Sequence, residues 1–430
     1  MSRLRGLVAD TRPLADDHFR RLWVANIVTV VGAQLTVVAV PAQIYADTGS
    51  SAYVGLTGVF GLVPLVVFGL WGGALADVFD RRTILICTTI GLIVTSGLFW
   101  VQAALGSTNV WLLLSLFSVQ QAFFAVNQPT RSAVLPRLLP PELLPAANSL
   151  NMTVFTAGGI AGPLVAGALI PVAGLEWLYL IDTFTLLATL SAVWRLPSLA
   201  VEGAATGAPG LRSVIEGFSY LRGQPVLLMS FVVDIIAMVF GMPRALFPQV
   251  ADESFGGHPE GGLAFALLFA AIPAGSVLGG IFSGWVSRVS AQGRAVVLCI
   301  VLWGLAMVGF GVSVGLATAY AGARGPLLVA AVLFLAVGGA ADMASAAFRS
   351  SMLQAAATDE VRGRLQGIFI VVVAGGPRVA DVAHGAAAAV VGTAAAAAGG
   401  GVLVVVGVVV AAVLVPSFVR YRVTSAAKPS

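Results

Sequence analysis

The feature that most constrains this chain is a series of long apolar segments separated by short polar loops. About 20 apolar residues are enough for a helix to cross the hydrocarbon core of a bilayer. Lipid offers no partner to a free backbone N–H or C=O, so such spans must be helical. The segments predict an all-α membrane protein with twelve transmembrane helices, near 22–45, 52–76, 83–104, 109–128, 147–171, 175–195, 226–249, 262–286, 295–317, 326–347, 365–390 and 396–417.

Composition agrees with a surface that faces lipid. Of the 430 residues, 58% are hydrophobic and 10% are charged, whereas about 25% of the residues of a soluble domain are charged. The net charge of +4 comes from arginines scattered among the loops. Since they form no single stripe, the sequence predicts no nucleic-acid partner.

The twelve segments divide into two sets of six. Between them, 196–224 contains Pro197, Gly203 and Pro209, which is typical of a linker. Within it, apolar residues recur at helical spacing over 211–221, which predicts a short amphipathic helix on the membrane surface. The predicted organisation is a tail (1–21), a six-helix bundle (22–195), a cytoplasmic linker (196–224), a second six-helix bundle (225–417) and a second tail (418–430).

The arginines predict the orientation. Residues 1–21 contain no apolar core of a signal peptide and are expected to be a cytosolic tail. If the N-terminus is inside, one side of the membrane holds most of the basic residues, as the positive-inside rule requires. They are Arg81, Arg82, Arg131, Arg137, Arg288, Arg294, Arg349, Arg362, Arg364, Arg420, Arg422 and Lys428. We therefore expect a multi-pass protein of the inner (plasma) membrane with both termini in the cytoplasm.

The two halves also resemble each other. Residues of the first half recur in the second at a spacing of 218: Arg131, Ser132, Leu135, Glu142, Gly158 and Gly167 match Arg349, Ser350, Leu353, Glu360, Gly376 and Gly385. Parallel repeats of this kind build transporters with a central site between the halves. The pattern predicts a duplicated six-span unit.

A short loop carries a family resemblance. It contains Gly73, Asp77, Arg81 and Arg82, with Asp80 in place of a second glycine. This resembles the signature loop of the major facilitator superfamily, and a degenerate copy contains Gly284, Arg288 and Arg294. The resemblance implies two pseudo-symmetric six-helix bundles that alternate access to a midplane cavity. It also implies that these loop residues act in gating, with Asp77 as a latch, whereas the simpler alternative is positive-inside topology alone.

Further segments narrow the resemblance to one branch. Ala39–Gln43, the Pro273 region and Arg362-Gly363-Arg364 are similar to those of enterobactin (siderophore) exporters and Tap-type multidrug efflux pumps. A small-residue face at Gly158, Gly162, Pro163 and Gly167 resembles the antiporter motif of the superfamily. The resemblance implies export of amphipathic drugs or siderophore-like metabolites. Small-residue faces also pack ordinary membrane helices.

Charged residues inside the spans are the candidate coupling sites, because an ionised side chain at the bilayer centre costs about 2.5–3.5 kcal/mol. Asp234 has no opposite charge nearby in the sequence, so we expect an unpaired carboxyl group that binds a proton near neutral pH. The alternative is a carboxyl group hydrogen-bonded to a neighbouring helix. Arg378 and Asp381 share a helix face and form either a structural clamp or part of a proton path, and Asp182 is a similar candidate.

Other polar residues in the spans are candidates for the lining of a substrate cavity. Arg244 either meets an anionic substrate or extends to the lipid headgroups. Asp342 and Arg349 lie two turns apart on one helix face. The remaining candidates, which bind a ligand or only hold helices together, are Asn26, Gln34, Gln120 and Gln121.

Several motifs are missing. The only lysine is Lys428, so the chain has no P-loop. ATP hydrolysis is therefore not its energy source unless another subunit supplies the ATP-binding site. The three histidines lie far apart and predict no metal site, and no cofactor is expected.

The sequence therefore favours a monomeric secondary exporter driven by protons. The alternatives are an importer of the same fold, a polytopic membrane enzyme, for which no catalytic set is present, and a membrane sensor.

Overall fold

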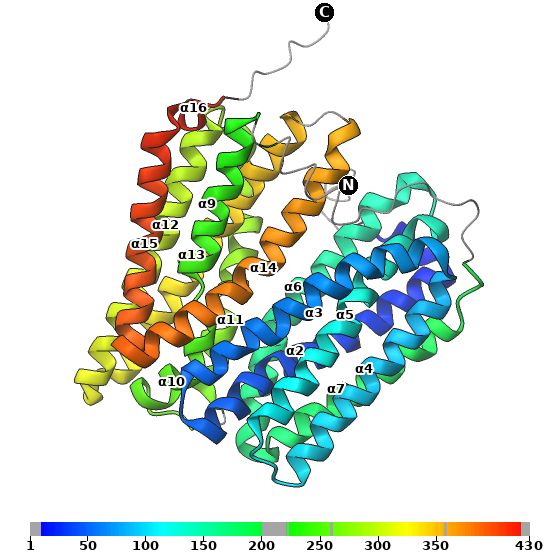
Figure 1. Ribbon diagram of the computed structural model, residues 1–430, viewed down its shortest axis with the longest axis horizontal. Coiled ribbons are helices and arrows are strands. Elements are labelled where there is room, and N and C mark those ends of the chain that lie inside the picture. Colours follow the sequence, from blue (N-terminus) through cyan, green and yellow to red (C-terminus); the bar gives the residue numbers. More distant parts are fainter. Residues whose placement is uncertain (1–9, 200–220, 222, 259–260, 357–358, 423–430) are drawn as a thin grey trace, which may run out of the picture. The chain divides into compact units, whose positions relative to one another are not determined.

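A computed structural model describes residues 10–199, 221, 223–258, 261–356 and 359–422 (Figure 1). The side chains of 70–78, 287, 354–371, 373 and 374 lie outside that description. The chain forms two compact units. Unit 1 comprises Met1–Asp47, Phe60–Gly210 and Glu260–Ala266, and unit 2 comprises Thr48–Val59, Leu211–Pro259 and Leu267–Ser430.

All long elements are helices, as the apolar segments predict. In the first half they are α2 (Asp17–Thr48), α3 (Ser51–Val78), α4 (Arg81–Ala104), α5 (Val110–Leu138), α6 (Leu144–Ala173) and α7 (Leu175–Trp194). In the second half they are α9 (Pro225–Gly241), α11 (Leu263–Ile281), α12 (Gln292–Ala319), α13 (Arg324–Ala356), α14 (Asp359–Val391) and α15 (Thr393–Leu414). Among the described residues, eleven segments are long and apolar enough to cross a membrane. Together with α14 they give the predicted twelve.

Short elements connect or end these helices. They are η1 (Arg12–Ala15), η2 (Pro141–Leu143), η3 (Arg244–Leu246), α10 (Phe247–Gln249), η4 (Val250–Ser254), η5 (Ser283–Arg288), η6 (Ala321–Ala323) and α16 (Pro416–Val419). The predicted amphipathic helix at 211–221 lies outside the described residues, except for Leu221, which is buried.

Several helices extend beyond their predicted apolar spans. Arg131 and Arg137, beyond the predicted end of their span at 128, lie within α5, and Arg349, beyond the predicted end at 347, lies within α13. The predicted ends of these two spans were too early. Hydropathy detects the apolar part of a helix and misses polar turns that continue it.

A single glycine separates the last two helices of each half. Gly174 joins α6 to α7 with φ +90°, and Gly392 joins α14 to α15 with φ +83°. Each donates its backbone N–H to the carbonyl four residues earlier, Ile170 or Ala388, at 2.9 Å. A positive φ favours glycine at such joints. The two glycines are also 218 residues apart, so the internal repeat extends to matching helix junctions. Gly392 marks the boundary between the last two spans, which the sequence predicted between residues 390 and 396.

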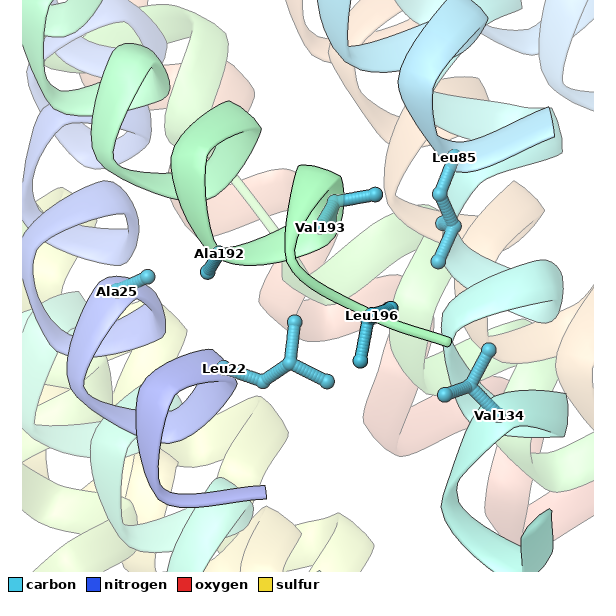
Figure 2. Packing of buried hydrophobic residues seen from close by; sticks show 7 residues of the cluster. All are labelled: Leu22, Ala25, Leu85, Val134, Ala192, Val193 and Leu196. Atoms are coloured by element: carbon cyan, nitrogen blue, oxygen red, sulfur yellow. The ribbon is translucent and has the colours of Figure 1, made fainter. Parts of the chain in front are cut away.

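Unit 1 contains an apolar cluster where four helices meet. Leu22 and Ala25 of α2 pack with residues of α4, α5 and the α7 end (Figure 2). The other members are Leu85, Val134, Ala192, Val193 and Leu196. Because lipid is as apolar as these side chains, the packing stabilises the bundle through close contact more than through exclusion of water.

Candidate functional site

The membrane-spanning part of unit 1 contains a row of buried polar side chains. Thr29, Thr36 and Gln43 are spaced seven residues apart on α2 and therefore lie along one face of the helix. All three are buried. Thr29 Oγ1 donates to the backbone oxygen of Thr185 at 3.0 Å and lies 2.6 Å from Thr189 Oγ1. These bonds connect α2 to α7 at the level of Thr29.

Asp182 of α7 lies in the middle of this row. Its side chain is 2% exposed, and its Oδ2 accepts hydrogen bonds from Thr36 Oγ1 at 2.7 Å and Ser96 Oγ at 2.9 Å. Oδ1 has no hydrogen-bond partner among the described residues. Asp182 therefore has hydroxyl partners from α2 and α4.

A second group closes one end of the row. Gln43 and Gln102 exchange amide hydrogen bonds at 3.1 and 2.9 Å, and Tyr179 Oη donates to Gln43 Oε1 at 2.9 Å. The Tyr179 ring stacks on Phe99, with centroids 5.2 Å apart. The groups satisfy one another, which fixes the positions of α2, α4 and α7.

In unit 2, the predicted coupling residue Asp234 has a partner that the sequence did not indicate. Asp234 of α9 forms an ion pair with Arg349 of α13, and both are buried, with side chains 1% and 6% exposed. Arg349 Nη2 also lies 3.9 Å from Oδ1 of a second carboxyl group, that of Asp342, two turns earlier on α13. The expectation of an unpaired Asp234 was wrong, because its partner is distant in sequence. The predicted shared face of Asp342 and Arg349 is present.

A second charged cluster involves α14. Asp381 lies 3.5 Å from the guanidinium of Arg244 on η3, and its side chain is 8% exposed, whereas that of Arg244 is 35% exposed. Arg378, one turn earlier, interacts electrostatically with both. The predicted Arg378–Asp381 pair is therefore part of a three-residue cluster. His384 of the same helix is buried, with Nδ1 3.1 Å from the Ala380 carbonyl.

The other predicted cavity residues are dispersed over unit 1. Asn26 and Gln34 of α2 are half-buried, and Gln120 and Gln121 of α5 are each 8% exposed. Neighbouring Asn127 donates to Thr88 Oγ1 of α4 at 2.8 Å. That bond shows how an amide in this span holds two helices together.

The small-residue face of α6 packs against α2. Gly158 lies against Val30 and Gly162 against Gln34, and Gly158, Gly162, Pro163 and Gly167 are all buried. The absence of side chains allows the two helices to approach closely. This contact supports the packing interpretation, and the antiporter role stays a prediction.

The gating-loop candidates are only partly described. Gly73 and Asp77 lie on the last turns of α3, where side chains are outside the described part. Arg81 donates to the Ala133 carbonyl at 3.3 Å and Arg82 to the Trp194 carbonyl at 2.7 Å, so they contact the ends of α5 and α7. Arg288 and Arg294 are exposed.

Asp80, the residue that departs from the signature, caps α4. Its carboxylate accepts from the Arg82 amide at 2.8 Å, from Ser198 Oγ at 2.5 Å and from the Leu199 amide at 3.3 Å. Burial raises the pKa of the Asp80 carboxyl, but these hydrogen bonds and one from Thr83 outweigh it, so the pKa lies below its usual value. The ionised form of Asp80 therefore joins the α3–α4 loop to the segment after α7.

Asp80→Ala should lower the melting temperature of the purified protein at neutral pH, since loss of an N-cap costs about 1 kcal/mol. Because the folded-state pKa is depressed, this stabilisation is present above the unfolded pKa of about 3.9 and is lost as pH falls through the folded value. The difference in melting temperature between wild type and variant should become smaller in acid. Glu142→Ala, at an exposed acid of η2, is the control. A gap that does not change with pH would contradict the assignment.

Sequence reasoning overlooked several members of these clusters. Thr36 and Ser96 are ordinary in apolar spans, and Arg349 lay beyond the predicted end of its span. The seven-residue spacing of Thr29, Thr36 and Gln43 is the signal that could have revealed the polar face of α2. In the described residues, no group of three or more His, Cys, Asp or Glu side chains could hold a metal ion.

Comparison with known proteins identifies the family. The model of the transmembrane secretion effector family, within the major facilitator superfamily, matches residues 8–428. The chain belongs to this family. It is similar to the enterobactin exporter EntS of Shigella boydii serotype 18, with 27% identity over 356 residues, or 82% of this chain and 80% of the relative.

Solved structures show the same fold. A bacterial homologue of the human lysosomal transporter Spinster, inward-facing and unoccupied, has a TM-score of 0.69 at 17% identity and covers 97% of this chain and 100% of its own. A POT family transporter in complex with 5-aminolevulinic acid has a TM-score of 0.72 at 12% identity, covering 93% and 96%. These likenesses show the major facilitator fold. Membership of the secretion effector family and similarity to the enterobactin exporter make the chain a multi-pass secondary transporter and not an enzyme.

Proposed function

We propose that this protein exports small amphipathic molecules, either drugs or siderophore-like metabolites, by alternating access coupled to proton entry. The observation that carries the proposal is the pair of buried charge clusters in unit 2, Asp234–Arg349–Asp342 and Arg244–Asp381–Arg378. Groups this costly to bury in a membrane are retained at ion and substrate pathways. Similarity to an enterobactin exporter and to a secretion family supports export over import.

Protons are the proposed coupling ion. The chain has no P-loop for ATP, and buried carboxyl groups can gain and lose protons as their surroundings change. Asp234, Asp381 and Asp182 are all at least nine-tenths buried. Asp182 is held by hydroxyl groups, whereas the other two lie beside arginines, so a proton on Asp234 or Asp381 would also change an ion pair.

The Arg244 cluster is the proposed contact for an anionic part of the substrate. Arg244 is a third exposed, and its Nε is a buried donor without a partner in the described residues. A guanidinium forms strong, directional hydrogen bonds with carboxylate and similar anions. An amphipathic ligand that carries an anionic group, such as a catechol-type chelator, would place that group here and its apolar body against the surrounding helices.

The arginine distribution supports a cytoplasmic location of both termini. In this orientation the Asp80 cap and the Arg81 and Arg82 contacts belong to the cytoplasmic loop between α3 and α4.

Accumulation assays test the function. Cells that overproduce the protein should retain less ethidium, or less of a catechol-type iron chelator, than cells that lack it. A protonophore should abolish the difference, because it removes the proton gradient. Greater accumulation on overproduction would indicate import, and an unchanged difference with the protonophore would exclude proton coupling.

A further inference from the structure

The three groups of the Asp234 cluster do not balance in charge. Two carboxyl groups, Asp234 and Asp342, share one guanidinium, Arg349. The chain buries this set in two membrane-spanning helices, α9 and α13. With both carboxyl groups ionised, the cluster would carry one surplus negative charge in a medium of low dielectric, which is costly unless a cation binds.

Neighbouring helices supply no second buried cation in the described part. The short helix η5, whose Trp285 packs on Phe348 of α13, carries only the exposed Arg288. α11 and α15 contain no ionisable residue, and Asp234 is the only one on α9. α12 contributes Cys299, which interacts electrostatically with Asp342, and the exposed Arg294. On α14, Arg378, Asp381 and His384 belong to the Arg244 cluster. The side chains of Asp359, Glu360, Arg362 and Arg364 lie outside the description.

The two carboxyl groups are held differently. Asp234 is 1% exposed and forms the close ion pair with Arg349, whereas Asp342 is 27% exposed and lies 3.9 Å from the same guanidinium. A proton on Asp234 would leave the buried Arg349 without its closest counter-ion. A proton on Asp342 removes the surplus charge and leaves the ion pair intact.

An unpartnered hydroxyl group lies on the same helix face. Ser345 is one turn from both Asp342 and Arg349 on α13, because residues three and four apart share a face. Its side chain is 1% exposed, and its Oγ has no hydrogen-bond partner among the described residues. Asp234 Oδ1 and Arg349 Nε are buried and unpartnered as well. Such orphaned polar atoms indicate a site that is completed by a bound species.

We propose that the Asp234–Arg349–Asp342 cluster is the binding site for one monovalent cation, that the cation is a proton, and that Asp342 takes it up while Asp234 stays ionised as the counter-ion of Arg349. Arg349 and Asp234 are then positioning residues, and Asp342 is the group that titrates. The inference deepens the proposed function and rests on it for its role in transport. It assigns the proton to Asp342, which the sequence analysis proposed as a substrate-cavity residue, in place of Asp234, which it proposed as the proton-binding residue.

Infrared difference spectroscopy of the purified full-length protein tests the site without a substrate. Lowering the pH should produce the carbonyl band of a protonated carboxyl group. Asp342→Asn should remove the band that Asp342 contributes. Asp234→Asn/Arg349→Gln, which deletes the pair as a neutral unit, should keep it. If Asp234 were the proton carrier, the double variant would lose the band and Asp342→Asn would retain it.

A conservative variant distinguishes loss of the titrating group from misfolding of the Asp342→Asn variant. Asp342→Glu keeps a titrating group and should shift the position of the band, and an unshifted band would overturn the assignment. Thermal melting accompanies each variant. Sodium ions added at constant pH should leave the band unchanged. If sodium suppresses the Asp342 band of the wild type at constant pH, the site binds sodium and the proton assignment fails.

Proteoliposomes separate this inference from the proposed function. An imposed pH gradient should drive ethidium transport by the wild type, and Asp342→Asn should reduce it to the rate of protein-free vesicles. If the wild type shows no pH-driven transport of ethidium or a catechol-type chelator but Asp342 still gives the infrared band, proton-coupled export fails and the site assignment stands. If transport is pH-driven and Asp342→Asn leaves both band and transport intact, the assignment fails alone.

Discussion

Arg349→Gln should cost about 3–5 kcal/mol of stability, because removal of one partner of a buried ion pair leaves the other charge uncompensated. Asp234 would then lie 1% exposed inside a membrane-spanning helix, with Asp342 nearby and no cation between them. Thermal melting of the purified variant in detergent measures the effect, together with the fraction that elutes as a single species. We expect a large drop in the melting temperature and in the fraction that elutes as a single species.

A second substitution in the same variant isolates the cause. Asp234→Asn, added to Arg349→Gln, removes the charge that was left unpaired and should recover most of the lost stability, because deletion of a whole pair is far less costly than deletion of half of it. Arg294→Gln, at an exposed arginine on α12, is the control for loss of a guanidinium. If the double variant melts no higher than Arg349→Gln, the pair is not the source of the effect.

This pair also shows where sequence reasoning stops. Apolar segments locate the long helices, because the thickness of the bilayer fixes their length and their backbone must be hydrogen-bonded within the segment. Pairing between helices depends on packing that no local pattern encodes. Arg349 lay beyond the predicted end of its span, so Asp234 was interpreted without a partner.

Local spacing predicted part of the candidate site. Asp342 and Arg349 share a helix face, and Arg378 and Asp381 lie within electrostatic range, as their spacings indicate. Arg244 also belongs to the Arg378–Asp381 cluster because η3 packs on α14. That contact joins residues more than 130 positions apart, so the sequence did not predict it. Similarly, the hydroxyl partners of Asp182 come from two other helices, and serine and threonine are too common in spans to be singled out.

The glycines of the second half have different roles that their sequence context does not distinguish. Gly399 and Gly401 are two residues apart on α15. A Cβ atom at Gly399 would meet nothing within 4 Å, whereas one at Gly401 would lie 2.5 Å from the Gly304 oxygen, 2.7 Å from the Val308 nitrogen and 3.0 Å from Met307 Cβ. Gly401 therefore allows α15 to approach the backbone of α12 closely, as small residues do where membrane helices cross.

Gly401→Ala should consequently destabilise the protein by about 1–3 kcal/mol, since an added methyl group in a close-packed contact forces the helices apart. The obstacles include backbone atoms of α12, which cannot rotate away as a flexible side chain would. Gly399→Ala is the matched control, because it makes the same chemical change on the same helix in open space. Alanine also favours the helix by up to about 1 kcal/mol relative to glycine, so the control should melt at or above the wild-type temperature. Equal melting temperatures for the two variants would show that the α12–α15 contact does not depend on Gly401.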